Sequence, residues 1–458
     1  AQGYLIGMSL WFYAYANLQY LWLLLFSCLI GWLLSCVPEK ISSEKGKKVL
    51  TGVGCVFHLG LLGYFKYSNF FLENLNTVFH TDFPMLQILL PVGISFYTFQ
   101  QLAYLIDRCR GDAPRDSFFD YLTFMVYFPQ LLQGPILLRS EFMGQLKEPE
   151  RRRFHAERFS EGIQFFVFGL AKKVLLADTL AKAVNYGYSN VSMLDSISAL
   201  LLAVGYLTEL YFDFSGYCDM AVGLGKMIGL EVAENFDAPF HSASVKEFWR
   251  RWHMTLGRFF TRYVYIPLGG NRRGKMRTLC NVMIVMLLSG LWHGAAWTFV
   301  LWGFLHGVGM IWDNLEHPHL PKKWMRQAAT FAYVCMTFVF FRAESIAQGI
   351  DVLKSIVSLK WNGFVFQMAS ALDMTECYII TKALSMKLPG LLSWFWLGIF
   401  VVLIAICFRV LSGEKVSGVV ALQRQKGYGR LYPVLLAVLS NWSMISMTGV
   451  SEYLYFSF

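Results

Sequence analysis

The amino-acid sequence predicts an all-α, polytopic integral membrane protein with about ten spanning or re-entrant helices. Three features carry this prediction. Of the 458 residues, 56% are hydrophobic and only 15% are charged, against about 25% charged residues in soluble domains. The apolar residues occur in long runs rather than in one-sided stripes, and basic residues collect in short loops between the runs.

Five apolar runs are nearly free of charge and are long enough, or almost long enough, to cross a bilayer, which takes about 20 apolar residues. The runs are Leu5 to Val37, Val49 to Leu72, Leu86 to Ile106, Leu391 to Leu411 and Leu431 to Met447. No charged stretch and cleavage site of a signal peptide precedes the first run. The chain starts at Ala1, which leaves open a trimmed N-terminus and one further helix upstream.

The net charge of +10 indicates membrane topology rather than nucleic-acid binding. Clusters of Lys and Arg in short loops mark the cytoplasmic side. They occupy Lys40 to Lys48, Arg108 to Arg115, Arg139 to Arg158, Arg272 to Arg277, Lys322 to Arg326 and Arg409 to Arg430. The loops Asn74 to Gln87 and Ala183 to Ser196 contain neither residue, so we expect them on the opposite side.

Neither a linker nor an internal repeat divides the chain, and we predict one domain over residues 1–458. Nine cysteines are scattered without CxxC or Cys/His ligand spacing, so we predict neither a disulfide framework nor a metal site. Phe118 to Leu138 is broken by Pro129, Gly134 and Pro135 and has basic residues at both ends, which predicts a re-entrant segment.

A second unusual region begins with Ser244 to Glu247, which has the pattern of a capping box at a helix start. On one continuous helix reaching Tyr263, aromatic and apolar residues share one face and basic residues the other. This pattern predicts an amphipathic helix in the membrane interface, with His253 at the border of the two faces.

The next apolar region, Cys280 to Ile311, has basic residues before and after it, so we expect it to enter the membrane and return. A helix starting at Cys280 would place His293 about 20 Å into the roughly 30 Å hydrocarbon layer. A buried imidazole tends to stay neutral and is suited to accept a proton from a hydroxyl group. Ser289, four residues earlier, offers a covalent alternative through a Ser–His relay.

Ionisable residues inside apolar segments are functional candidates by default. Each also has a structural interpretation: Asp213 and Asp219 as ion-pair partners of Arg or as caps of a broken helix, His253 as an interfacial residue, and His293 and His306 as packing residues. The local sequence alone leaves both interpretations open.

The chain resembles the membrane-bound O-acyltransferase family, in particular its bacterial alginate O-acetyltransferase branch. The resemblance runs from Tyr64 to Phe458 and rests on the number and order of its motifs. These are Pro91 to Phe99, Phe128 to Pro135, Gly169 to Val174, Tyr211 to Tyr217, Phe248 to His253, Tyr265 to Asn271, Gly290 to Gly294 and the C-terminal Glu452 to Phe458.

The resemblance implies that His293 is the catalytic histidine and His253 a second functional histidine, both facing a tunnel through the membrane. It also implies acetyl-coenzyme A as the acyl donor, with no bound cofactor, and an extracytoplasmic partner of the serine-hydrolase type. We expect supporting or tunnel-lining roles for Asp213, Ser215, Tyr217, Asp219, Trp252, Trp292, Asn271 and His306. From charge placement, we expect donor binding by Arg250, Arg251, Arg272 and Arg273.

Two positions depart from the pattern of the family. Phe260 to Tyr263 places Arg262 where relatives have an acid, and Glu209 stands where Gln is expected. The resulting prediction is an O-acetyltransferase of the bacterial inner membrane that modifies alginate, a cellulose-like polymer or peptidoglycan. The alternatives are a teichoic acid D-alanyltransferase on the same fold, a proton-coupled transporter and a structural scaffold for polysaccharide export.

Overall fold

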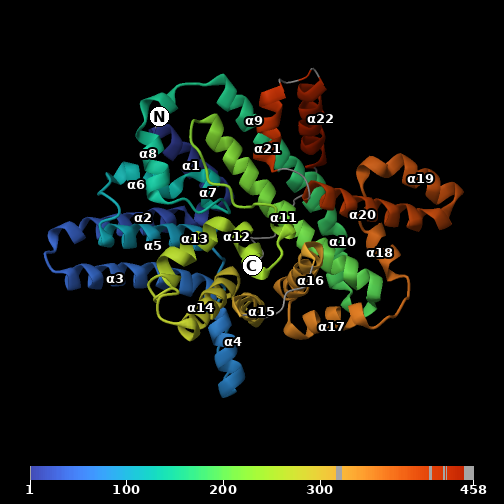
Figure 1. Ribbon diagram of the computed structural model, residues 1–458, viewed down its shortest axis with the longest axis horizontal. Coiled ribbons are helices and arrows are strands. Elements are labelled where there is room, and N and C mark those ends of the chain that lie inside the picture. Colours follow the sequence, from blue (N-terminus) through green and yellow to red (C-terminus); the bar gives the residue numbers. More distant parts are fainter. Residues whose placement is uncertain (1, 316–321, 412–414, 427–428, 430, 448–458) are drawn as a thin grey trace. The chain divides into compact units, whose positions relative to one another are not determined.

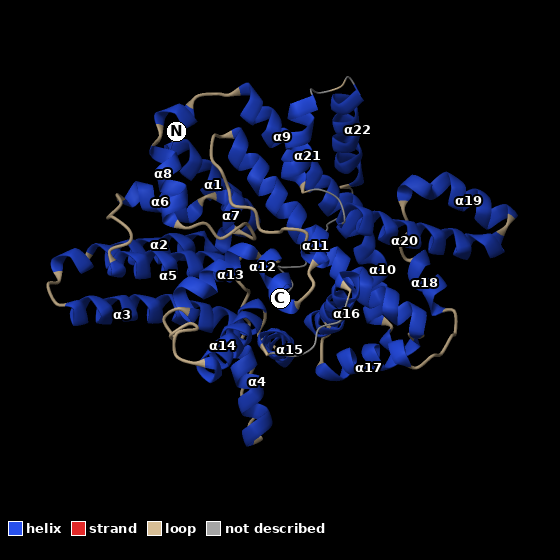
Figure 2. Ribbon diagram, viewed as in Figure 1, coloured by secondary structure: helices blue, strands red, loops and turns tan. Residues whose placement is uncertain are grey.

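The computed structural model describes residues 2–315, 322–411, 415–426, 429 and 431–447. Over these residues the secondary structure consists of helices joined by turns and extended connections, with no strand (Figure 2). Five of the described helical stretches are long and apolar enough to cross a membrane: Gln2–Cys36, Glu44–Phe79, Ser196–Met227, Lys275–His293 and Pro389–Val410. The predicted all-α fold is confirmed. The motif Glu452 to Phe458 lies outside the described residues.

The chain forms two compact units, each assembled from three stretches. The first comprises residues 1–163, 221–234 and 255–270, and the second comprises 164–220, 235–254 and 271–458. Helices α9 (Ala156–Ala171) and α11 (Ser196–Met227) each continue from one unit into the other. The prediction of a single domain over 1–458 stays a prediction.

Within the first unit, α2, α3 and α5 pack together (Figure 1). The bounds in this unit are α1 Gln2–Asn17, α2 Leu21–Cys36, α3 Glu44–Leu62, α4 Ser68–Phe79, α5 Ile94–Arg110, α6 Phe118–Val126, α7 Phe128–Leu131, α8 Arg139–Lys147 and α13 Met254–Phe260. The apolar run from Leu86 becomes helical only at Ile94, because Pro91 cannot donate a helical hydrogen bond and Gly93 adopts a φ of 75°. The predicted span is therefore shorter than the run.

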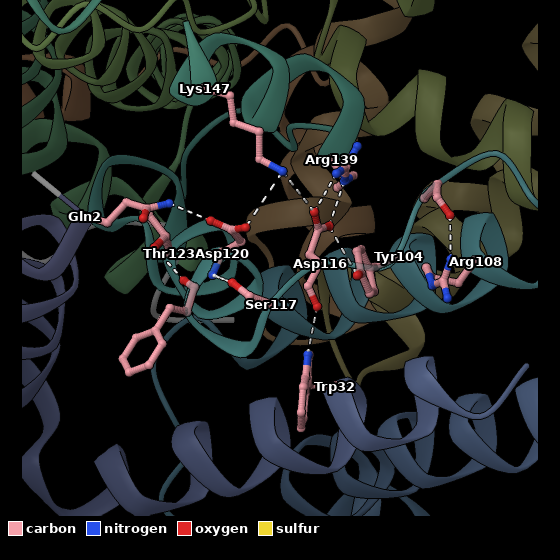
Figure 3. A network of polar contacts seen from close by, with 12 residues as sticks. Gln2, Trp32, Tyr104, Arg108, Asp116, Ser117, Asp120, Thr123, Arg139 and Lys147 are labelled. Carbon is pink, nitrogen blue, oxygen red and sulfur yellow. Dashed lines mark hydrogen bonds and ion pairs between the residues drawn. The ribbon is translucent and has the colours of Figure 1, made fainter. Parts of the chain in front are cut away.

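The re-entrant segment predicted at Phe118 to Leu138 folds back so that its two ends meet (Figure 3). Asp116, before α6, accepts two hydrogen bonds from the guanidinium of Arg139, the first residue of α8, at 2.7 and 2.5 Å. Tyr104 and Lys147 approach the same carboxylate, at 3.2 and 3.7 Å. Since the Asp116 side chain is buried, this bidentate pair closes the loop, and the two ends of the segment meet as a re-entrant segment requires.

Arg262, which replaces the acid expected from the family, has acidic partners of its own. Its guanidinium lies 2.9 Å from the Asp107 carboxylate and 3.1 Å from that of Asp112. Asp107 also accepts a hydrogen bond from the hydroxyl of Tyr263 at 2.9 Å. The arginine therefore makes ion pairs inside the first unit, and no role of an acid transfers to it.

The second unit contains a helical hairpin formed by α14 (Lys275–His293) and α15 (Trp297–Asn314), which lie side by side (Figure 1). This hairpin agrees with the prediction that Cys280 to Ile311 turns back on itself. The other bounds in this unit are α10 Asp178–Ser189, α12 Val245–Arg251, α16 Lys323–Arg342, α17 Ile346–Val357, α18 Phe364–Ser370, α19 Tyr378–Lys387, α20 Pro389–Leu411, α21 Val416–Lys426 and α22 Leu431–Ser446.

The prediction of one continuous amphipathic helix from Ser244 to Tyr263 is wrong. The helix starts as expected, with the Ser244 hydroxyl accepting from the backbone N–H of Glu247 at 3.1 Å. It ends at Arg251, however, and His253 has a φ of 45°, which no helix accommodates. A new helix begins at Met254, and the side chain of His253 is buried inside the protein instead of lying at the border of two helix faces.

Candidate active site

Two glycines determine how closely the hairpin helices α14 and α15 approach each other. A Cβ atom on Gly303 would lie 2.5 Å from the carbonyl oxygen of Met286, and one on Gly290 would overlap the carbonyl oxygen of Phe299. Small residues at such crossings allow the backbones of membrane helices to touch. The crossing places His293, the last residue of α14, beside the first turns of α15.

His293 is enclosed by aromatic rings. Its ring centroid lies 4.9 Å from that of Trp292, 5.2 Å from that of Trp302 and 5.2 Å from that of Phe341. Only 5% of the residue is exposed. Such burial strengthens electrostatic interactions inside the site.

The bend at His253 is shaped by a neighbouring loop. On one side of the bend the backbone N–H of Met254 donates to the carbonyl oxygen of Asn235 at 2.9 Å, and on the other side that of Asp237 donates to the carbonyl oxygen of Arg251 at 2.9 Å. These two bonds hold Trp252 and His253 between them. A left-handed conformation at a non-glycine residue costs energy and occurs where surrounding structure imposes it, often at functional sites.

The His253 side chain is held in one tautomer. Its Nδ1 lies 3.2 Å from Oδ1 of Asn235, whose amide nitrogen donates to the sulfur of Cys218 at 3.4 Å. Nδ1 therefore carries the proton, and Nε2 presents a lone pair that has no hydrogen-bond partner among the described residues. Burial lowers the pKa of His253 from 6.5 to about 3, so the ring is neutral at physiological pH.

The two predicted histidines come together in the folded chain. Their ring centroids are 6.4 Å apart, and both rings contact Trp292, His253 at 6.1 Å and His293 at 4.9 Å. Phe214 of α11 packs perpendicular to His253 at 4.7 Å. The arrangement brings two imidazoles together among aromatic rings, and imidazole is suited to accept and donate protons near neutral pH.

His306 has a structural environment. Its Nδ1 accepts from the indole N–H of Trp249 at 3.2 Å, and its Nε2 lies 2.9 Å from the Thr337 hydroxyl. The Thr337 hydroxyl in turn donates to the carbonyl oxygen of Val334, so it accepts the proton of Nε2. With both ring nitrogens engaged, His306 ties α15 to α12 and α16 and supports the site indirectly.

Asp213 and Asp219 of α11 form ion pairs with two lysines that follow α9; the Lys173–Asp213 pair is buried, and the Lys172–Asp219 pair is partly exposed. Lys173 lies 2.6 Å from Asp213 and 2.7 Å from Asp178, and Lys172 lies 2.6 Å from Asp219. Gly169 and Gly216 allow this approach, since a Cβ on Gly216 would lie 2.7 Å from the carbonyl oxygen of Gly169. The structural interpretation of Asp213 and Asp219 as ion-pair partners therefore holds, with Lys rather than Arg as the cation.

The remaining predicted residues divide by exposure. Ser215 and Tyr217 are buried on α11, and Trp252 packs between Phe236 and Phe248 at 5.1 and 5.3 Å. Arg251 is half-buried and pairs with Glu247 at 2.9 Å. The residues exposed to solvent are Arg250, Asn271, Arg272 and Arg273.

Ser289, the alternative nucleophile, is buried, and its hydroxyl has no hydrogen-bond partner among the described residues. A Ser289–His293 relay is therefore not assembled in this structure. Sequence reasoning missed Asn235 and Trp302. Trp302 had a usable signal, because pairing Gly290 with Gly303 across the hairpin brings it beside His293.

The sequence model of the membrane-bound O-acyltransferase family matches residues 110–349. This range contains both histidines, the hairpin and the ion-paired α11. The chain belongs to the membrane-bound O-acyltransferase family. The predictions of an O-acyltransferase enzyme and of a multi-pass membrane protein are thereby confirmed.

Named relatives cover much of the chain. It is 36% identical over 388 residues to the peptidoglycan O-acetyltransferase of Helicobacter pylori, across 78% of this chain and 73% of that protein. It is 41% identical over 309 residues to the probable alginate O-acetylase AlgI of Pseudomonas putida, across 65% of this chain and 62% of that protein. Identity to the teichoic acid D-alanyltransferase of Bacillus subtilis is 28% over 271 residues, across 55% of this chain and 69% of that protein.

Proposed function

We propose that this protein transfers an acetyl group from a cytoplasmic donor to hydroxyl groups of an extracytoplasmic polysaccharide, in the inner membrane of a bacterium. The observation that carries the proposal is the enclosed pair of His293 and His253, 6.4 Å apart, in a member of an O-acyltransferase family. Relatives named as O-acetylases of peptidoglycan or alginate reach 36–41% identity. The named D-alanyltransferases reach 28% and provide the second candidate activity.

His293 acts as the base in this proposal. It takes the proton of the acceptor hydroxyl while the hydroxyl oxygen attacks the acyl carbonyl carbon. The new carbon–oxygen bond forms, the carbon–sulfur bond of a thioester donor breaks, and the proton passes from His293 to the leaving sulfur. The bare Nε2 of His253 offers a second acceptor, which orients the hydroxyl or the thiol within the enclosure.

The donor in this proposal is acetyl-coenzyme A, whose phosphates would meet basic side chains. Arg250, Arg272 and Arg273 are exposed and available for this role. We expect the double variant R272A/R273A to raise the KM for the donor about 3- to 10-fold at unchanged kcat, because each arginine–phosphate contact contributes to binding but not to the chemical step. Steady-state kinetics at several donor concentrations measure this split. An unchanged KM would mean that residues other than Arg272 and Arg273 bind the phosphates of the donor.

The partner would be an extracytoplasmic transferase of the serine-hydrolase type that passes the acetyl group to the polysaccharide. The test of the function compares cells that express the protein with cells that lack it. Mild alkali releases ester-linked acetate and D-alanine from purified alginate-like, cellulose-like, peptidoglycan and teichoic acid fractions. We expect acetate in one glycan fraction to depend on the protein. Dependence of D-alanine instead would support the second candidate activity, and dependence of neither would refute both.

A further inference from the structure

The indole N–H of Trp302 is a buried donor without an acceptor. The residue is 1% exposed, and Nε1 has no hydrogen-bond partner among the described residues. An indole N–H can only donate, and buried donors in native proteins almost always have an acceptor. The exception at Trp302 therefore calls for a physical account.

Trp302 lies directly beside the proposed base. Its ring centroid is 5.2 Å from that of His293, at an interplanar angle of 85°. The Gly290–Gly303 crossing fixes this proximity, because Gly303 follows Trp302 and Gly290 precedes His293 by one helical turn. The close helix crossing thus places Trp302 next to the proposed base.

A second tryptophan of the same cluster provides a contrast. Trp249 packs against Trp302 at 5.6 Å, and its N–H donates to Nδ1 of His306. One indole N–H of this pair therefore serves the scaffold, while the other, on a ring that packs against His293, has no acceptor among the described residues.

We propose that the Trp302 indole N–H donates a hydrogen bond to the acyl carbonyl oxygen and stabilises the oxyanion that forms on attack; this inference rests on the proposed acyl transfer. When the acceptor oxygen bonds to the carbonyl carbon, the π electron pair moves onto the carbonyl oxygen. A fixed donor aimed at that oxygen stabilises the developing charge more strongly in a dry enclosure than in water. Trp302 keeps its proton throughout, and the hydroxyl proton travels through His293 to sulfur as the carbon–sulfur bond breaks.

The structural alternative is an N–H directed at an aromatic face. Phe341 and Phe338 lie 5.0 and 5.5 Å from Trp302, close enough to receive such a contact. This alternative predicts an effect of Trp302 on packing alone, whereas the oxyanion role predicts an effect on the transition state.

The test uses the substitution Trp302→Phe, which keeps an aromatic ring and removes the N–H. We expect kcat for acetyl transfer to fall about 10²- to 10³-fold, with a much smaller rise in the donor KM, because the hydrogen bond is weaker to the ground-state carbonyl oxygen than to the oxyanion. Trp249→Phe is the matched control: it removes the neighbouring, structurally engaged N–H, and we expect kcat per folded molecule within about threefold of wild type.

Two unreactive donor analogues separate catalysis from folding. A thioether analogue of acetyl-coenzyme A lacks the carbonyl, so its binding measures the number of folded donor sites. A ketone analogue retains the carbonyl, so its binding also reports the hydrogen bond from Trp302. We expect Trp302→Phe to weaken ketone binding only. The inference is overturned if Trp302→Phe loses affinity equally for both analogues, or if its kcat stays within about threefold of wild type. Activity of the wild-type protein leaves the proposed function standing in either case. A wild-type protein that transfers acetyl from no thioester donor overturns the proposed function itself.

Discussion

His293→Ala is expected to lower the rate of acetyl transfer by about 10²- to 10⁴-fold, the range typical of a lost general base. The neighbouring rings of Trp292, Trp302 and Phe341 carry no group that could take over as a base. His253 is held 6.4 Å away by Asn235 and by the backbone pairing of its bend. The measurement is kcat with purified protein at equal folded concentration.

His155→Ala is the control for this prediction, since His155 is exposed and belongs to the other unit. We expect its rate to match wild type. A His293→Ala protein that keeps more than a tenth of the wild-type rate would remove His293 as the base. The unpartnered Nε2 of His253 would then be the next group to test.

Features that depend on local composition were predictable from the sequence. The ends of Phe118 to Leu138 meet because prolines and glycine break the helix between two basic flanks, and that pattern is visible in the chain itself. His293 was a candidate because an ionisable group in an apolar segment is costly and needs a function. The structure adds that this histidine ends α14 inside an aromatic enclosure.

The bend at His253 was not predictable, because a contact distant in sequence imposes it. Arg250 to Met254 has a composition compatible with a helix, and its binary pattern continues smoothly to Tyr263. The backbone of Asn235 to Asp237 pairs with both sides of the bend and overrides that local preference. The role of the Asn235 side chain, which fixes the tautomer of His253, was not predictable for the same reason, because the two residues are distant in sequence.

The partners of the α11 acids were also beyond a single sequence. Forty residues separate Lys173 from Asp213, and the contact depends on the close approach at Gly169 and Gly216. The sequence showed two lysines and two acids in separate apolar stretches without indicating which of them pair. Their pairing makes the next prediction specific.

Lys173→Met is expected to destabilise the protein by about 3–5 kcal/mol, the cost of leaving a buried charge without its counter-ion. Lys173 lies between Asp213 and Asp178, and the side chains of Lys173 and Asp213 are 5% and 1% exposed. The buried carboxylate of Asp213 would lose its cation while Glu209 remains within electrostatic range. Thermal unfolding of the purified protein in detergent, followed as a fall in Tm, measures the effect.

The double variant Lys173→Met/Asp213→Asn tests whether the loss comes from an uncompensated charge or from altered packing. Removing both charges eliminates the desolvation penalty, so we expect most of the lost Tm to return. Lys172→Met should cost less, because the side chains of Lys172 and Asp219 are 15% and 19% exposed and water can solvate the remaining acid. Lys354→Ala breaks an exposed pair with Asp351 and should leave Tm unchanged. If the double variant melts as low as Lys173→Met, the lysine stabilises α11 through its hydrocarbon stem, and the ion pair is not what holds this helix beside α9.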